Sequence, residues 1–299
     1  MLYYLFYCLQ TTMNLFINDQ LLAQSAASPL CFDRGLLLGD GLFETIRAEN
    51  NTLLFFDAHY QRLKQGAVAL AIDFTLSALE LKNRCHQLLA ANGLDAAIAS
   101  LRITLTRGPS ERGIDIPKQQ KPTLLIHAAA YINTIAKPKS VYITDIIRNE
   151  YSPIIHLKTT NYLELILAKK QAVDRGYDDG LMPNTKGAIT ELSTANIFVV
   201  IGDNIITPPL KDGVLPGIMR QEIITASRQR NIDIVEKTLY PDDLLAASEC
   251  FSSNSLIEIQ PIISVNEHCF TTGAEATMTQ RVIEAYIAHK EALYVISSR

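Results

Sequence analysis

A lysine between two apolar segments is the residue of this sequence best placed to do chemistry. Lys158 follows the apolar residues 154–157 and precedes residues 162–175, whose apolar face is typical of a helix. Burying a lysine as a cation is costly, whereas its neutral amine is a nucleophile and a base. The ordinary alternative is a lysine that extends from a strand end into solvent. Lys158 alone therefore does not decide between a catalytic and a surface role.

Two charged residues elsewhere could serve such a lysine. Arg62 lies in the sequence HYQRL at residues 59–63, inside a predicted helix, and Glu191 lies in a predicted strand within residues 187–198. Taken singly, each has a plain interpretation, because most arginines and glutamates of helices and strands face solvent. Only their combination with Lys158 points to a site.

Two further segments have the chemistry of a phosphate site. Residues 215–220 read LPGIMR, so Gly217 leads directly into a predicted helix. Backbone N–H groups at a helix start attract anions, and glycine lets a phosphate approach the backbone closely. The amides of Ile218 and Met219 would be the donors. Residues 251–262 add the polar side chains of Asn254 and Ser255.

The order of these segments resembles that of one known family. Residues 31–47, CFDRGLLLGDGLFETIR, are similar to the opening signature of the class IV aminotransferase and aminodeoxychorismate lyase family. The segments 59–63, 187–198, 215–220 and 251–262 follow in the family's order, and the resemblance covers about residues 14–265. It implies a two-domain α+β fold like that of D-amino-acid aminotransferase, with the active site between the domains and a homodimer.

The same resemblance implies pyridoxal 5′-phosphate (PLP) as the cofactor. Lys158 would bind PLP covalently and then take the proton from the amine-bearing carbon of the substrate. Glu191 would keep the pyridine nitrogen protonated, which makes PLP an electron sink. Three segments would contact PLP through its phosphate: Arg62; Gly217, Ile218 and Met219; and Asn254 or Ser255.

The reaction is open between two classes. The residues 161–164 and 254–256 favour 4-amino-4-deoxychorismate lyase, which releases pyruvate and 4-aminobenzoate for folate biosynthesis. Glu258 instead stands where lyases usually carry glycine and aminotransferases carry glutamate, so a branched-chain or D-amino-acid aminotransferase is the alternative. The third possibility is a non-catalytic homologue that kept the fold and lost the reaction. The presence of Lys158, Arg62 and Glu191 disfavours it. A PLP-loaded protein would be coloured and an empty scaffold colourless.

A substrate with carboxylates is best bound by an arginine, whose guanidinium pairs with a carboxylate through two hydrogen bonds. Arg112, in the charged loop that begins at Arg107, is the first choice, and Arg107 is the second. The alternative for Arg112 is a solvated loop arginine. Phe43 stands where D-amino-acid transaminases carry a tyrosine, and residues 112–114 lack their Arg-x-His pair, which disfavours that substrate class. Phe43 is included among the substrate-binding residues.

Composition excludes several other functions. The 27 basic and 31 acidic residues are scattered and give a net charge of −4, so nucleic acid is not an expected partner. The 5 cysteines are widely spaced and no grouping has metal-ligand spacing, so we predict no metal and a reducing cytoplasm.

Residues 1–12 are apolar but too short to span a membrane. We expect neither signal nor anchor there, and hypothesise that translation begins at Met13.

The predicted elements divide the chain into two parts. We expect an N-terminal α/β domain at 13–132, a linker at 133–140 and a C-terminal α+β domain at 141–299 that carries the lysine. In the first part we predict a strand, a hairpin and two helices, which Asp57 and Thr75 would cap, before two more strands. In the second, strands cluster and helices cluster, with helices at 162–175, 218–230 and 274–294. This grouping indicates an α+β fold.

Overall fold

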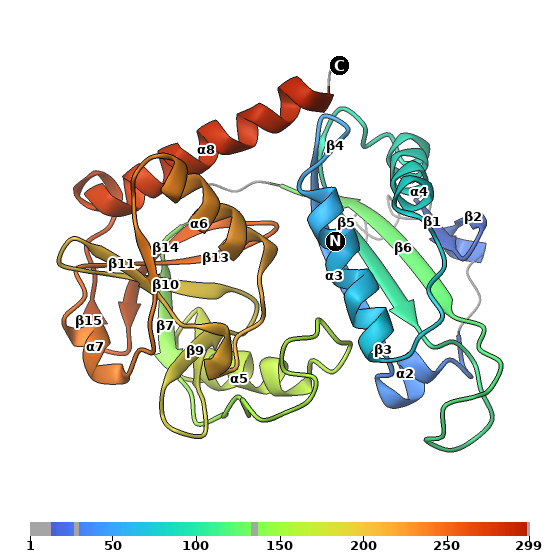
Figure 1. Ribbon diagram of the computed structural model, residues 1–299, viewed down its shortest axis with the longest axis horizontal. Coiled ribbons are helices and arrows are strands. Elements are labelled where there is room, and N and C mark those ends of the chain that lie inside the picture. Colours follow the sequence, from blue (N-terminus) through green and yellow to red (C-terminus); the bar gives the residue numbers. More distant parts are fainter. Residues whose placement is uncertain (1–12, 27–29, 133–136, 298–299) are drawn as a thin grey trace, which may run out of the picture. The chain divides into compact units, whose positions relative to one another are not determined.

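The computed structural model describes residues 13–26, 30–132 and 137–297 and divides into two compact units (Figure 1). The first unit comprises residues 1–132 together with 158–161, and the second comprises 133–157 and 162–299. Both units combine helices with sheets, which confirms the predicted α+β class. The hypothesis about Met13 concerns residues 1–12, and residues 133–136 hold half of the predicted linker; both stretches lie outside the described residues. β7 begins at Lys139, before the predicted linker ends.

The first unit is built on a six-stranded sheet in the order β2-β1-β6-β5-β3-β4. The strands are β1 (Asn14–Ile17), β2 (Gln20–Ala23), β3 (Gly41–Glu49), β4 (Thr52–Leu53), β5 (Ile98–Thr106) and β6 (Thr123–Ala130). The helices are α2 (Arg34–Leu38), α3 (Phe56–Ala69) and α4 (Ala78–Ala91). α3 packs against β3, and α4 packs against β1 and β6. Apolar residues of β5 such as Leu101 and Ile103 are buried, whereas Arg102 between them is exposed, because successive side chains of a strand point to opposite faces.

The predicted helix caps in this unit were wrong. Asp57 lies in the first turn of α3, and the residue before that helix is Phe55, with a φ of 53°. α4 begins after Ser77 and not after Thr75. The Ser77 hydroxyl accepts a hydrogen bond from the backbone N–H of Glu80, and the Glu80 carboxylate accepts one from the N–H of Ser77. This reciprocal pair is a capping box, which stabilises a helix start.

The segment 158–161 attaches to β3 by backbone hydrogen bonds. The N–H of Phe43 donates to the carbonyl of Lys158 over 2.9 Å, and the N–H of Thr160 donates to the carbonyl of Gly41 over 2.9 Å. The Thr160 hydroxyl also donates to Gly39 over 2.7 Å. These bonds explain why Lys158 groups with the first unit, whereas the sequence led us to expect it in the second.

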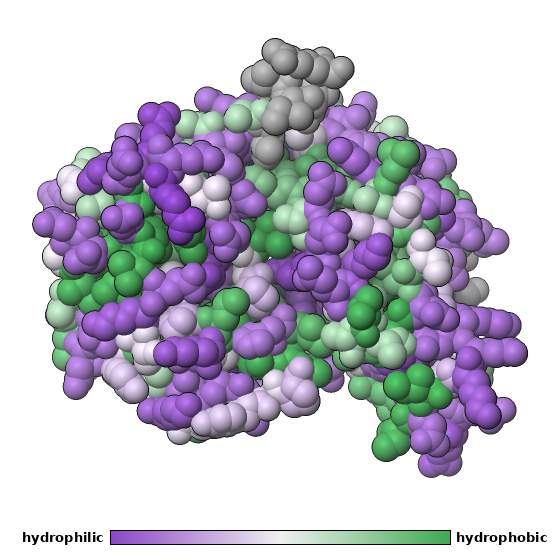
Figure 2. Space-filling model, viewed as in Figure 1, coloured by the Kyte–Doolittle hydropathy of each residue, from purple (hydrophilic) through white to green (hydrophobic). Residues whose placement is uncertain are grey.

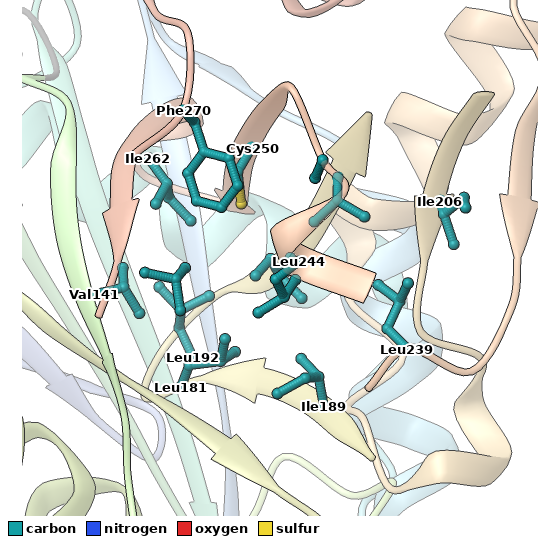
Figure 3. Packing of buried hydrophobic residues seen from close by; sticks show 14 of the residues in the cluster. Val141, Leu181, Ile189, Leu192, Ile206, Leu239, Leu244, Cys250, Ile262 and Phe270 are labelled. Carbon is teal, nitrogen blue, oxygen red and sulfur yellow. The ribbon is translucent and has the colours of Figure 1, made fainter. Parts of the chain in front are cut away.

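The second unit contains a nine-stranded sheet in which β9 pairs with both β8 and β10. The strands are β7 (Lys139–Ile143), β8 (Asp179–Pro183), β9 (Ile189–Leu192), β10 (Asn196–Ile201), β11 (Asn204–Thr207), β12 (Ile234–Glu236), β13 (Glu249–Asn254), β14 (Glu258–Val265) and β15 (His268–Cys269). The double pairing of β9 closes a ring through β10, β13, β14, β7 and β8. Buried apolar residues from these strands, among them Val141, Leu181 and Ile262, pack together with Leu244 and Phe270 (Figure 3).

In the described part of this unit, the α-helices are α5 (Leu163–Val173), α6 (Ile218–Gln229), α7 (Pro241–Leu245) and α8 (Thr277–Ser297). α6 and α8 pack against each other and against β13 (Figure 1). On the β10–β13 face away from the core cluster, the rings of Phe198 and Phe251 stack with centroids 4.8 Å apart. We did not predict β2, α2, β11, β14 and β15. Among the described residues, no helix has the length and apolar character needed to cross a membrane, and no three metal-binding side chains come together.

Candidate active site

Lys158 lies above an aromatic ring that it shares with an arginine. Its Nζ is 4.6 Å from the centroid of the Phe43 ring, and the Arg102 guanidinium carbon is 3.7 Å from the same centroid. Phe43 is buried and Arg102 is exposed. Arg102 sits opposite Thr45 in the β3–β5 pairing. The structure thus brings two cationic groups together in the first unit, and the sequence reasoning identified only one of them.

Arg62 is held by a buried carboxylate that the sequence reasoning also missed. Its Nε and Nη2 donate to the two oxygens of Glu44 over 2.7 and 2.6 Å. Glu44 is 1% exposed and also contacts His59 Nδ1 at 2.7 Å. Burial favours a higher pKa for Glu44, but the charge and hydrogen bonds of Arg62 and the hydrogen bond of His59 outweigh it and lower this pKa to about 2. For His59, burial lowers the pKa and outweighs the hydrogen bond to the Glu44 carboxylate, which would raise it. Glu44 is therefore ionised and orients Arg62.

Arg107 is a structural residue by its contacts. Its five N–H donors have protein acceptors at Asp40 (two oxygens), Gln120 and the carbonyls of Leu70 and Ala71. Asp40 also accepts from Arg34 over 2.7 Å, and Arg34 donates to the carbonyls of residues 113, 114 and 115. Arg112 is exposed on the loop that Arg34 holds. Of the two predicted substrate arginines, only Arg112 is therefore available for a substrate.

Glu191 sits where β9 meets β10 in the second unit. Glu191 is 6% exposed, and its Oε1 forms an ion pair with Arg148 Nη2 at 3.0 Å. Its Oε2 accepts hydrogen bonds from the Leu215 N–H over 3.0 Å and from Asn196 Nδ2 over 3.4 Å. A buried carboxylate costs free energy unless it has charged or hydrogen-bonding partners, and these contacts explain how Glu191 can be ionised in the protein interior. Its surroundings fit a group that faces a protonated ring nitrogen.

The start of α6 lies beside the same cluster. Gly217 is the residue before the helix, and Asn196 Nδ2 also donates to the carbonyl of Leu215 over 3.1 Å. A β-carbon added at Gly217 would collide with Asn196 Oδ1. A larger residue here would therefore push the Asn196 side chain aside, and glycine has no side chain to cap the amides of Ile218 and Met219. A helix start of this kind fits the phosphate of PLP.

The turn after β13 separates the roles of Asn254 and Ser255. Asn254 Oδ1 accepts hydrogen bonds from the backbone N–H groups of Leu256 and Ile257, each over 3.0 Å, and its Nδ2 donates to the carbonyl of Thr194 over 3.1 Å. Asn254 therefore shapes the turn. The turn that it shapes carries Ser255, the other predicted phosphate contact.

The fold is that of the solved class IV aminotransferases, which are PLP-dependent enzymes of fold type IV. The family described as amino-transferase class IV matches residues 41–265, which is most of the chain, so the protein is a member of that family and PLP is its cofactor.

Three relatives illustrate the range of activities within the similarity. A protein of Methanocaldococcus jannaschii, provisionally assigned as a branched-chain-amino-acid aminotransferase, is 30% identical over 92% of this chain and 95% of its own. The aminodeoxychorismate lyase of Bacillus subtilis is 28% identical over 90% of this chain and 92% of its own. The branched-chain aminotransferase of Thermoproteus uzoniensis, solved with norvaline, superposes with a TM-score of 0.85 at 28% identity, over 92% of this chain and 93% of its own. The family is therefore certain, and both reaction classes occur within it.

Proposed function

We propose that this protein is a 4-amino-4-deoxychorismate lyase that releases pyruvate and 4-aminobenzoate for folate biosynthesis. The observation that carries the proposal is the pair of cations at Phe43, where the Arg102 guanidinium and the Lys158 amine both contact the same ring. The substrate has two carboxylates, and arginine binds a carboxylate through two parallel hydrogen bonds. The neighbouring residues of this strand pair, Thr45 and Thr104, are polar, which suits this substrate better than an aliphatic amino acid.

PLP would be held by residues already described. We propose Lys158 as the covalent attachment, Arg62 and Ser255 as phosphate contacts with the amides that follow Gly217, and Glu191 at the ring nitrogen. Bound in this way, PLP supplies an electron sink for the carbon that loses its proton. Glu44 orients Arg62, and Arg148 keeps a cation beside Glu191, so each charged group that would meet PLP has a supporting partner.

Side chains of the protein would carry out the proton transfer and hold the substrate. Lys158 removes the proton from the amine-bearing carbon of the substrate. The C–O bond to the enolpyruvyl group then breaks, the released enolpyruvate takes a proton to become pyruvate, and the ring becomes aromatic. Arg102 and Arg112 hold the carboxylates in place during both bond changes, which fixes the substrate relative to Lys158.

An aminotransferase is the second candidate, favoured by the relative with 30% identity and by Glu258. Glu258 has a φ of 61°, the left-handed region that favours glycine. The backbone at this position thus accommodates the glycine of lyases as well as glutamate.

We also propose a homodimer in a reducing cytoplasm. Around α2, Phe32, Leu36 and Leu37 are 76%, 69% and 61% exposed, and apolar side chains reach the surface in the region of α2 (Figure 2). A second copy of the chain would cover this apolar surface. Of the described cysteines, Cys31 and Cys269 are exposed and unbridged, which suits a reducing compartment. Light scattering of the purified protein should give twice the chain mass; a monomer would contradict the dimer.

A coupled assay tests the reaction. Purified, PLP-loaded protein receives enzymatically generated aminodeoxychorismate, and 4-aminobenzoate and pyruvate are both measured. We expect both products with the wild type and with Lys170→Ala, whose lysine lies exposed on α5, and neither product with Lys158→Ala. If the substrate is untouched while branched-chain or D-amino acids with 2-oxoglutarate yield glutamate, the protein is an aminotransferase. A colourless protein that binds no PLP would contradict both reactions.

A further inference from the structure

The last helix, α8, is fixed to β13 near its start. Glu249, the first residue of β13, is 5% exposed, and its carboxylate accepts hydrogen bonds from the backbone N–H groups of Met278 and Thr279 over 3.1 and 2.7 Å. A carboxylate at the start of a helix satisfies its unpaired amides and interacts favourably with the helix dipole. The first turn of α8 is thereby anchored to the beginning of the strand.

A second contact lies further along α8. Tyr286 Oη and Lys290 Nζ, one turn apart on the helix, both donate to Oε1 of Glu258, over 2.7 and 2.8 Å. Glu258 is the residue that pairs with Asn254 where β13 and β14 are joined. The five residue-to-residue steps of β13 from 249 to 254 rise about 17 Å, and the helix from Thr279 to Lys290 rises about 17 Å as well. α8 therefore follows β13 to its far end.

Glu258 and Asn254 together fix both ends of the turn that carries Ser255. Asn254 orders the turn from within through the amides of Leu256 and Ile257. Glu258 has the left-handed φ of 61°, which costs free energy for a residue with a β-carbon and persists only where surrounding contacts hold it. The bonds from Tyr286 and Lys290 are such contacts.

α8 also contacts the helix whose start is the other proposed phosphate contact of this unit. His289 Nε2 lies 2.8 Å from Glu222 Oε2, and Glu222 belongs to α6. The side chains at 286, 289 and 290 thus reach from one stretch of α8 to Glu258, which ends the turn that carries Ser255, and to α6. Helix packing of α6 on α8 reinforces the connection.

We propose that Glu258, Tyr286 and Lys290 are positioning residues through which α8 sets the geometry of the phosphate site at Ser255 and α6. The proposal rests on the proposed binding of PLP. It gives Glu258 a role independent of whether the reaction is elimination or transamination: its carboxylate holds the turn in place for the phosphate.

Comparison of PLP with pyridoxal, which lacks the phosphate, tests this role. Apoprotein of the wild type, Tyr286→Phe and Lys290→Met is titrated with each compound, and the ratio of the two dissociation constants is the readout. Losing one hydrogen bond to the carboxylate should weaken PLP binding about fivefold while pyridoxal binding stays unchanged. Lys290→Arg should restore the ratio. Lys170→Met, which removes an exposed lysine paired with Asp174 on α5, is the matched control and should leave it unchanged.

Glu258→Gly separates positioning from stability. Glycine relieves the left-handed φ, which offsets part of the stability lost with the hydrogen bonds of Tyr286 and Lys290, and its preference for PLP over pyridoxal should fall as in Lys290→Met. The proposal would be overturned if the variants bound PLP and pyridoxal equally more weakly, or if Lys290→Met and Glu258→Gly kept the wild-type ratio of the two dissociation constants. If the wild type itself binds no PLP and shows no visible absorbance, the proposed function fails instead.

Discussion

Replacing Glu44 by glutamine tests the buried charge cluster that orients Arg62. The substitution keeps the size of the side chain and removes its charge. Moving the pKa of Glu44 from 4.5 to about 2 corresponds to roughly 3 kcal/mol in favour of the folded protein above pH 4.5. Because Arg62 and His59 would then lie beside a neutral amide, we expect Glu44→Gln to lower the free energy of unfolding by about that amount at pH 7.

The same reasoning fixes the pH dependence. A carboxyl whose pKa is lowered on folding stabilises the protein above its unfolded pKa, and this contribution is lost as the pH falls toward the folded value. The stability difference between wild type and Glu44→Gln should therefore shrink between pH 4.5 and about 2. Urea unfolding followed by tyrosine fluorescence measures it, since the chain has 12 tyrosines and no tryptophan.

Asp174→Asn is the control for Glu44→Gln, because Asp174 forms an exposed ion pair with Lys170 and should change stability by less than about 1 kcal/mol. Equal stability of Glu44→Gln and wild type at pH 7 would refute the reasoning. A stability difference that stays constant down to pH 3 would refute it as well.

Further substitutions test individual contacts. Arg102→Met should raise KM for an anionic substrate at least about tenfold and leave the visible PLP spectrum intact; an unchanged KM would remove Arg102 from the substrate site. Gly217→Ala should displace Asn196 and weaken PLP binding, measured by titrating the apoprotein; unaltered affinity would contradict the close packing. Arg107→Ala should lower the melting temperature strongly because its buried acceptors lose their donors, whereas Arg112→Ala should melt like the wild type and raise KM. The reverse order would exchange their assigned roles.

Local patterns in the sequence were sufficient for several elements. The apolar period of residues 218–230 predicted α6 to within one residue of its observed end, and glycine before it marked the helix start. Motif order likewise pointed to Lys158, Arg62 and Glu191. Elements such as α6 are predictable because a short stretch of chain encodes them.

Features that depend on distant contacts were not predictable in this way. Nothing near Arg62 in the sequence indicates that Glu44, on strand β3, would hold it, and Arg148 and Glu191 are likewise far apart in the sequence. β14 was missed because Glu258 and Gln260 interrupt its apolar pattern. Arg102 left a local signal: it is the one charged residue in the middle of the apolar strand 98–106. That pattern could have marked it as a candidate substrate contact.

The attachment of PLP to Lys158 is the central claim, and mass spectrometry after borohydride reduction tests it most directly. Reduction makes the bond between PLP and a lysine permanent, and digestion then locates the added mass. We predict that the peptide containing Lys158 carries the phosphopyridoxyl group and that the exposed Lys170 remains unmodified. A label on another lysine, or none on protein that is loaded with PLP, would contradict the account.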